Sequence, residues 1–185
     1  MELAADIMTA DAVETGEGDN EPLKGPLRRC LVTREVKPKT GLLRFGMNLW
    51  SPFRGAGIRV RRIAPDYREI EVELSLKWHN RNYIGTHFGG SLYAMTDPFY
   101  MLMLIHILGR DYVVSHQAGA IEYLIPAKGK VNARFTLDDA TIADIKAHTA
   151  GGRKYLPQMP VEVKNEAGEV VARVVHTLYI RKRQT

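Results

Sequence analysis

The sequence predicts a single α+β domain in which a mostly antiparallel sheet curves around one apolar helix. The segment Ser91–Leu108 is apolar on nearly every side, which is typical of a helix enclosed in a core. Residues 70–78 alternate strictly between apolar and polar side chains, which indicates a half-buried strand. Five further strand-like segments flank the helix, so the chain has enough strands to enclose it.

The elements are expected in a definite order along the chain. An amphipathic helix over Leu42–Trp50 ends before Pro52, because proline disfavours helix at the residue that precedes it. Asp138 is expected to cap a short helix that runs to about Thr149, and Asn165–Gly168 forms a hairpin-like turn. Strands are expected at Ile58–Ile63, Ile70–Trp78, Tyr112–Ile125, Val131–Leu137, Val161–Lys164 and Glu169–Ile180.

Length and composition suit one soluble globular domain with additions at its N-terminus. The chain has 185 residues, of which 45% are hydrophobic and 25% charged. We expect residues 1–25 to form a flexible acidic tail with a short helix near Leu3–Met8. Residues 26–57 are expected to form an N-terminal helical extension, and residues 58–185 the main domain.

The net charge of +5 is unevenly distributed along the chain. The first 21 residues hold seven acidic and no basic residues, so the rest carries 26 basic against 14 acidic residues, a net charge of +12. Such a basic body attracts polyanions, namely nucleic acid, anionic lipid or a phosphorylated small molecule such as coenzyme A. Charge alone does not choose among these partners.

Several features indicate a cytoplasmic protein without a transmembrane segment. The single cysteine, Cys30, cannot form an internal disulfide, which suits a reducing compartment. The N-terminus lacks the pattern of a secretory signal. Although Ser91–Leu108 is long enough to span a bilayer, it contains Asp97, Pro98 and His106, each of which is costly in lipid.

Two motifs resemble a known superfamily. The pattern Asn82-x-x-Gly-Thr-x-x-Gly-Gly90, followed seven residues later by Asp97, resembles the signature of hotdog-fold acyl-CoA thioesterases, particularly the phenylacetate-degradation-type branch. The segment from Ile121 to Gly129 resembles the strand that follows the family's helix. The resemblance covers roughly Ile58–Arg181 and implies a hotdog fold, in which a curved antiparallel sheet wraps around the central helix. An uncharacterised subgroup is indicated, because the family's histidine falls on Phe88 here.

The resemblance implies hydrolysis of acyl-CoA-like thioesters. Asp97 would act as general base or nucleophile, and the backbone N–H of Gly89 would polarise the carbonyl. Asn82 would orient water or substrate, and Ser115 on the following strand would help to hold the water. Coenzyme A would enter as part of the substrate, so no separate cofactor is expected.

The expected substrate contacts lie around the glycine-rich loop and beyond the following strand. His87, one place before the family's histidine position, is a candidate together with Phe88 and Gly90. Lys128 and Lys130 are the first candidates for the phosphates of coenzyme A. A metal site is not expected, because the histidines lack ligand-like spacing and there is only one cysteine.

The distance along the central helix indicates a site shared between subunits. Gly90 and Asp97 are separated by roughly 10 Å of helix, at about 1.5 Å per residue. Both groups must lie within about 3 Å of one reacting carbonyl. We therefore expect Asp97 of one subunit to act with Gly89 of another, in a homodimer or a tetramer.

Strand parity separates the candidate side chains that follow the helix. In a regular strand, Ser115 and Gln117 share a face with Ile121, and His116 points to the opposite face. Ser115 and His116 are therefore not expected to serve one site together.

Other interpretations stay open at this point. Asp97 followed by Pro98 is also a good N-cap and first-turn pair, so Asp97 could only start a helical segment at Pro98. The same fold could bind acyl chains or acyl-CoA without cleaving them, or hydrate or dehydrate an acyl thioester. Nucleic-acid binding is disfavoured, because the basic residues are not interleaved with exposed aromatic ones.

Overall fold

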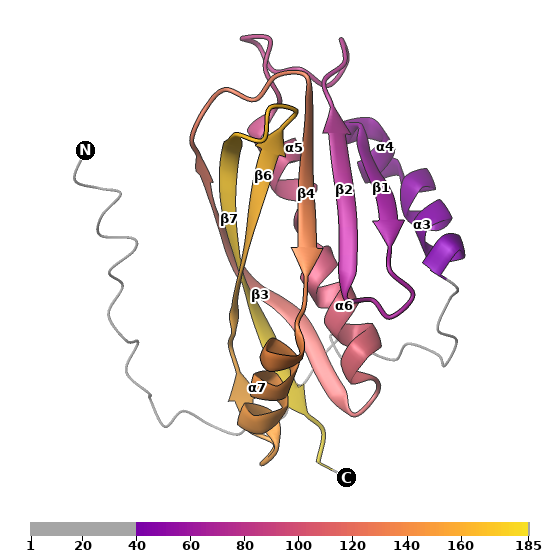
Figure 1. The fold of residues 1–185 in the computed structure, drawn as a ribbon, viewed down its shortest axis with the longest axis vertical. Helices are drawn as coiled ribbons and strands as arrows, with labels where there is room; N and C mark the ends of the chain where they lie inside the picture. The colour runs from indigo at the N-terminus through magenta and orange to yellow at the C-terminus, as the bar shows by residue number, and fades with distance from the viewer. Residues whose placement is uncertain (1–39, 185) are drawn as a thin grey trace, which may run out of the picture. The chain divides into compact units, whose positions relative to one another are not determined.

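The computed structural model describes residues 40–184, which belong to one compact unit (Figure 1). The predicted acidic tail, its short helix and Cys30 lie outside the described residues, and the division into tail, extension and domain stays a prediction. The elements in chain order are α3 (Thr40–Leu49), α4 (Ser51–Ala56), β1 (Ile58–Ile63), β2 (Glu69–Ser75), α5 (Gly89–Ala94), α6 (Phe99–Leu108), β3 (Tyr112–Tyr123), β4 (Lys130–Thr136), α7 (Asp139–Thr149), β5 (Lys154–Tyr155), β6 (Gln158–Asn165) and β7 (Val170–Lys182).

The strands form one antiparallel sheet in the order β1-β2-β4-β6-β7-β3, and the short strand β5 pairs with β7. All six strands expected from the sequence are present, and β5 was not predicted. Among the strands of the described residues, β1 and β3 therefore form the two edges. The prediction of a curved antiparallel sheet around a central helix is confirmed.

The central helix consists of two segments that lie against one face of the sheet (Figure 1). It is interrupted just before Phe99, where Pro98 supplies no N–H for the helical ladder. By length and composition Gly89–Leu108 could cross a membrane, but Met95, Phe99, Met103 and Leu104 are completely buried in the core. The segment is a core helix, as expected.

The inner face of the sheet follows the predicted alternation. On β2, Ile70 and Leu74 are completely buried and lie opposite Phe135 and Val131 of β4. The strand was expected to continue to Trp78, which was wrong: it ends at Ser75, and Trp78 is 82% exposed. The cause is Asn80, whose side chain donates to the Ser75 carbonyl and accepts from the Lys77 N–H. These bonds turn the chain away from the sheet.

The predicted N-terminal helix is confirmed as α3, and it lies alongside β1 (Figure 1). The side chain of Asn48 accepts a hydrogen bond from the Val60 N–H at 2.8 Å and donates to the Val60 carbonyl at 3.1 Å. The helix thereby covers part of the free edge of β1, which hinders another strand from pairing there. A second short helix, α4, follows with Pro52 in its first turn.

The two remaining local predictions also hold. Asp138 caps α7, because its side chain accepts a hydrogen bond from the Thr141 N–H at 2.7 Å. Asn165–Gly168 forms the turn between β6 and β7, where Gly168 has a φ of 84° that favours glycine. These two strands form a long antiparallel hairpin.

Candidate functional site

Asp97 lies in the turn between α5 and α6, with its side chain half exposed. Its Oδ1 atom is 2.9 Å from Nδ1 of His116 on β3. Within the described residues, the first helical residue of α6 is Phe99, its cap position is Pro98, and no side chain caps it. The interpretation of Asp97 as a helix cap is therefore wrong, because its carboxylate binds a histidine across the fold.

A β-bulge in β3 directly follows His116. The register against β7 shifts between His116 and Ala118, so Gln117 is an extra residue in the strand. An extra residue reverses the alternation that follows it. The expectation that Ser115 and Ile121 share a face is consequently wrong: Gly119 lies against Tyr93, and Ile121 packs on the core.

His116 continues into a chain of hydrogen-bonded side chains. Its Nε2 atom lies 3.2 Å from Nδ1 of His176 on β7, and Nε2 of His176 lies 3.1 Å from the Thr96 hydroxyl. His176 and Thr96 are completely buried, whereas 20% of the His116 side chain is exposed. The chain thus runs from a half-exposed carboxylate into the core.

The partners of this chain indicate where its protons lie. The Thr96 hydroxyl has one hydrogen and donates it to the Tyr93 carbonyl at 2.7 Å, so Nε2 of His176 must donate to Thr96. Neutral His176 then accepts from Nε2–H of His116, which also donates to the Ala118 carbonyl at 2.9 Å. Nδ1 of His116 lies 2.9 Å from Oδ1 of Asp97, so this chain of contacts ends at the carboxylate.

Burial shifts the titration of two neighbouring groups. Burial, with a smaller contribution from the nearby His116, lowers the pKa of His176 to about 4. Burial also raises the pKa of Tyr93, with a smaller contribution from the negative charge of Asp97. His176 is therefore neutral at physiological pH, consistent with the proton positions inferred from its partners.

His116 and His176 are the functional candidates that sequence reasoning missed. It sought ligand-like spacing along the chain, whereas the two histidines meet across paired strands. Possible ligand atoms of Asp97, His116 and His176 lie within 4.8 Å of one another, a donor set that suits a divalent transition metal. One sequence signal was present: His176 occupies an inward position of β7 between Val174 and Leu178.

The glycine-rich loop before α5 is held by the side chains of Asn82 and His87. Asn82 donates to the Thr86 hydroxyl and the His87 carbonyl, and it accepts from the Ile84 and Thr86 N–H groups. His87 is 3% exposed, and its Nε2 lies 3.0 Å from the Gly129 carbonyl. Burial lowers the pKa of His87, partly offset by that hydrogen bond. Both side chains thus build the loop, and their roles toward substrate stay predictions.

Gly89 and Gly90 form the first turn of α5, whose leading N–H groups have no acceptor within the helix. A side chain on Gly89 would come within 2.8 Å of the Tyr123 hydroxyl, and one on Gly90 would overlap the Phe88 ring. Phe88 is 59% exposed. The loop therefore presents backbone donors beside two aromatic rings.

The remaining predicted residues lie at two different places. Lys128 and Lys130 are exposed in the segment that the His87–Gly129 hydrogen bond ties to the glycine-rich loop, and Lys130 is 3.7 Å from Glu166. Ser115 is adjacent to His116 on β3 and pairs with Tyr179 of β7. The side chain that meets Asp97 is that of His116, and the role of Ser115 in holding water stays a prediction.

Comparisons with known proteins agree with this architecture. A Pseudomonas aeruginosa protein of unknown function, described as a probable thioesterase, is 19% identical with a TM-score of 0.68, covering 78% of this chain and 96% of its own. A Chlorobaculum tepidum protein of unknown function is 16% identical with a TM-score of 0.63, at 78% and 94% coverage. A Haemophilus influenzae thioesterase is 17% identical with a TM-score of 0.58, at 80% and 93% coverage.

At these identities the likeness concerns the fold, and the fold is the hotdog fold predicted from the sequence. No curated protein sequence matches the chain. The model of one family, described as a domain of unknown function (DUF4442), matches residues 39–180. Because this match spans most of the chain, the protein belongs to the DUF4442 family.

Proposed function

We propose that the protein hydrolyses acyl-CoA-like thioesters, with Asp97 as general base or nucleophile. The observation that carries the proposal is the half-exposed Asp97 carboxylate held by His116. The thioesterases of similar fold support this chemistry. The acyl-CoA substrate, the homodimer and the cytoplasmic location stay predictions.

In the proposed mechanism His116 positions the carboxylate. It binds Oδ1 of Asp97, so the other carboxylate oxygen is left to accept from water or to attack the thioester. As a base, Asp97 takes a proton from water while the water oxygen bonds to the carbonyl carbon. The tetrahedral intermediate then expels the thiolate, which receives that proton. As a nucleophile, Asp97 forms an anhydride and expels the thiolate, and water then cleaves the anhydride.

Distances along β3 support a site that uses two subunits. Within one chain, Asp97 contacts His116 of β3, whereas Gly89 lies beside the side chain of Tyr123. Tyr123 is seven positions further along the same strand. At a rise of about 3.3 Å per residue, His116 and Tyr123 are roughly 20 Å apart along the strand, and at about 1.5 Å per helical residue Gly89 and Asp97 are roughly 12 Å apart. Groups that act on one carbonyl must lie within about 3 Å of it, so these two do not meet in one chain.

The edge position of β3 offers a route to a suitable dimer. The strand pairs with β7 on one side, and Gln117, Ala118, Gly119 and Ala120 are exposed. Two copies that pair antiparallel about a point near Gly119 would oppose the His116 end of one strand to the Tyr123 end of the other. The partner's Gly89 would then approach Asp97 and polarise the carbonyl through its N–H.

The substrate would extend from this point toward the exposed lysines. The Phe88 ring is exposed beside Gly90 and would contact the substrate near the reacting centre. Lys128 and Lys130 lie next to the glycine-rich loop and would bind the phosphates of coenzyme A. Both contacts would therefore be made by residues at or next to the glycine-rich loop.

The test incubates purified protein with acyl-CoAs of different chain length and measures the release of free thiol. The proposal is supported if Asp97→Asn loses thiol release and Asp111→Asn retains it. Asp111 is the control because it is another exposed carboxylate. A single turnover in ¹⁸O-water tests the nucleophilic route. Label in the Asp97 side chain shows that Asp97 is the nucleophile and that water opens the anhydride at the Asp97 carboxyl carbon, because a general base puts the label only in the product acid.

The alternative function is binding of an acyl chain or acyl-CoA without cleavage. It is favoured by one observation: the Asn82 side chain is engaged in loop hydrogen bonds rather than free to orient water. Tight binding of acyl-CoA without release of thiol from any member of the panel would establish this alternative.

A further inference from the structure

The helix α3 exposes apolar side chains, while Arg44 and Asn48 form hydrogen bonds to the backbone of β1. Arg44 donates to the Arg61 carbonyl at 2.9 Å, and Asn48 bonds to the backbone of Val60. Leu43 and Met47 pack against the core. A surface helix normally presents its polar residues to water, so this arrangement is inverted.

The exposed residues form one continuous apolar stripe. Leu42, Phe45 and Leu49 are 67%, 61% and 52% exposed, and their spacing of three and four residues places them on one side of the helix. Trp50, at the end of the helix, is also 52% exposed. Isolated apolar residues on a surface need no explanation, but a contiguous row of four indicates a binding surface.

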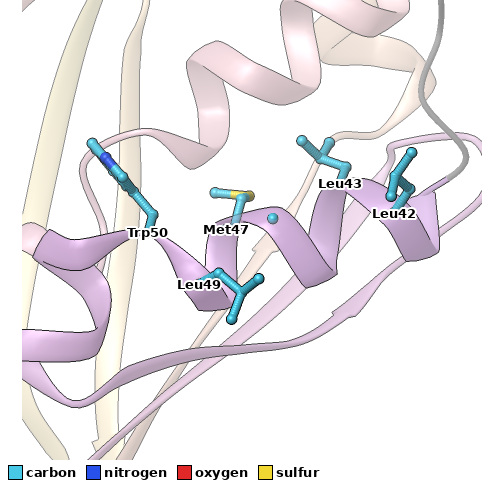
Figure 2. Close-up of a pocket in the computed structure, with 6 residues that line it drawn as sticks. Leu42, Leu43, Met47, Leu49 and Trp50 are labelled. Atoms are coloured by element: carbon cyan, nitrogen blue, oxygen red, sulfur yellow. The ribbon is translucent and has the colours of Figure 1, made fainter.

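This stripe borders a shallow groove along the helix (Figure 2). Leu43, Met47 and Trp50 point to one side and Leu49 points away, so the apolar surface wraps around the helix (Figure 2). Gly46 leaves a gap between the two sides, because nothing lies near the position that its side chain would occupy. The groove is lined by Leu42, Leu43, Gly46, Met47, Leu49 and Trp50.

The surroundings of the stripe are basic. From Thr40 to Pro65 the sequence contains five arginines and no acidic residue. Arg61 and Arg62 pair with Glu73 and Glu69 of β2. Arg44, Arg54 and Arg59 are exposed, and none of them forms an ion pair with another described residue. The positive charge of these three arginines remains available to an anionic partner.

We propose that α3, with Arg44, Arg54 and Arg59 around it, docks the protein on anionic lipid surfaces. An apolar face of leucine and aromatic residues beside cationic side chains is the chemistry of helices that lie in the membrane interface. The apolar stripe enters the headgroup boundary, and the arginines bind lipid phosphates. Because α3 lies beside β1, this surface is at the sheet edge opposite β3 and does not compete with the candidate site. The proposal is independent of thioester hydrolysis.

The test is co-sedimentation of the full chain with vesicles. We expect binding to vesicles that contain phosphatidylglycerol and little binding to phosphatidylcholine alone. Leu49→Glu should abolish binding, whereas Trp78→Glu, at an exposed tryptophan outside the stripe, should leave it unchanged. Arg54→Gln should weaken binding about fivefold, the effect of one basic residue near an anionic surface. Added salt should weaken it as well.

Fluorescence gives a second readout that does not depend on the Leu49→Glu variant. The chain has two tryptophans, so Trp78→Phe leaves Trp50 as the only one. Its emission should shift to shorter wavelength when anionic vesicles are added. The proposal is overturned if the vesicles neither bind nor shift the emission, or if Leu49→Glu leaves binding intact. It is equally overturned if Leu49→Glu dissociates an oligomer, because a second copy would then cover the stripe.

Discussion

The Asp97 carboxylate lies 2.9 Å from His116 Nδ1 and so joins the turn of the central helix to the edge strand of the sheet. His116 in turn contacts the buried His176, and His176 contacts the buried Thr96. Asp97 is therefore the outer end of a hydrogen-bonded chain that fixes the direction of its carboxylate.

Replacement of Asp97 by asparagine should abolish most thioester hydrolysis. The amide can neither take a proton from water nor attack the carbonyl, so kcat/KM should fall about 100- to 10,000-fold, the usual contribution of a general base. The free energy of unfolding should change little, because the side chain is half exposed. Unaltered kcat/KM in Asp97→Asn, measured beside Asp111→Asn as control, would contradict the assignment.

His116 should act through Asp97, which makes their substitutions non-additive. His116→Gln should lower kcat with little change in KM, because the variant keeps the binding surface but loosens the carboxylate. In the double variant with Asp97→Asn, the second substitution should cost far less than it does alone. Additive losses in this double-mutant cycle would show that His116 and Asp97 act independently.

Stability should depend on pH through His176. Its pKa is about 4 in the folded protein and 6.5 ordinarily, so between these values the unfolded chain binds the extra proton. Stability from this group is fully present above pH 6.5 and is lost as the pH falls toward 4. The loss should reach about 3 kcal/mol in the free energy of unfolding. His87, whose pKa is also lowered, adds in the same direction.

The His176→Gln variant isolates this contribution. Urea unfolding at a series of pH values should show a flatter dependence for His176→Gln than for the wild type. The exposed His79 provides the control, and His79→Gln should keep the wild-type slope. Parallel curves for the wild type and His176→Gln would contradict the assignment of a neutral, buried His176.

The N–H of Gly89 can be removed without breaking α5. Gly89 is the first helical residue, a position where proline is well tolerated, and the extended backbone of Phe88 suits a following proline. Gly89→Pro should lower kcat about 100- to 1,000-fold, the cost of one lost oxyanion donor. Gly89→Ala keeps the N–H and makes the same contact with Tyr123, so it should retain most activity. Equal losses in both variants would mean that the contact, not the donor, matters.

The fold was accessible from the sequence because its elements have regular patterns. Residues 70–75 alternate between apolar and polar side chains, and the segment before Leu108 is apolar on nearly every side. Each pattern is local in the sequence, and both predictions are confirmed. The bulge at Gln117 has no clear signal in the sequence. Counting every second residue along the strand therefore assigned Ile121 to the wrong face of the sheet. Trp78 continued the alternation but left the sheet because Asn80 binds Ser75 and Lys77.

The candidate site could be predicted only in part from the sequence. The spacing from the glycines directed attention to Asp97, but His116 and His176 meet there through the pairing of β3 with β7, a contact between residues 60 positions apart in the sequence. His87, a predicted substrate contact, is buried at the Gly129 carbonyl, and its role toward substrate stays a prediction. Residue type and spacing indicated the chemistry, and tertiary contacts decided which side chains are adjacent.

The central claim is that each site combines Asp97 of one subunit with Gly89 of the other, and subunit complementation tests it most directly. Asp97→Asn and Gly89→Pro proteins, each inactive, are unfolded together and refolded as a mixture. In mixed dimers one site pairs an intact Asp97 with an intact Gly89, so random mixing should restore about one quarter of wild-type activity. A mixture that forms mixed dimers yet stays as inactive as its two parents would contradict the claim.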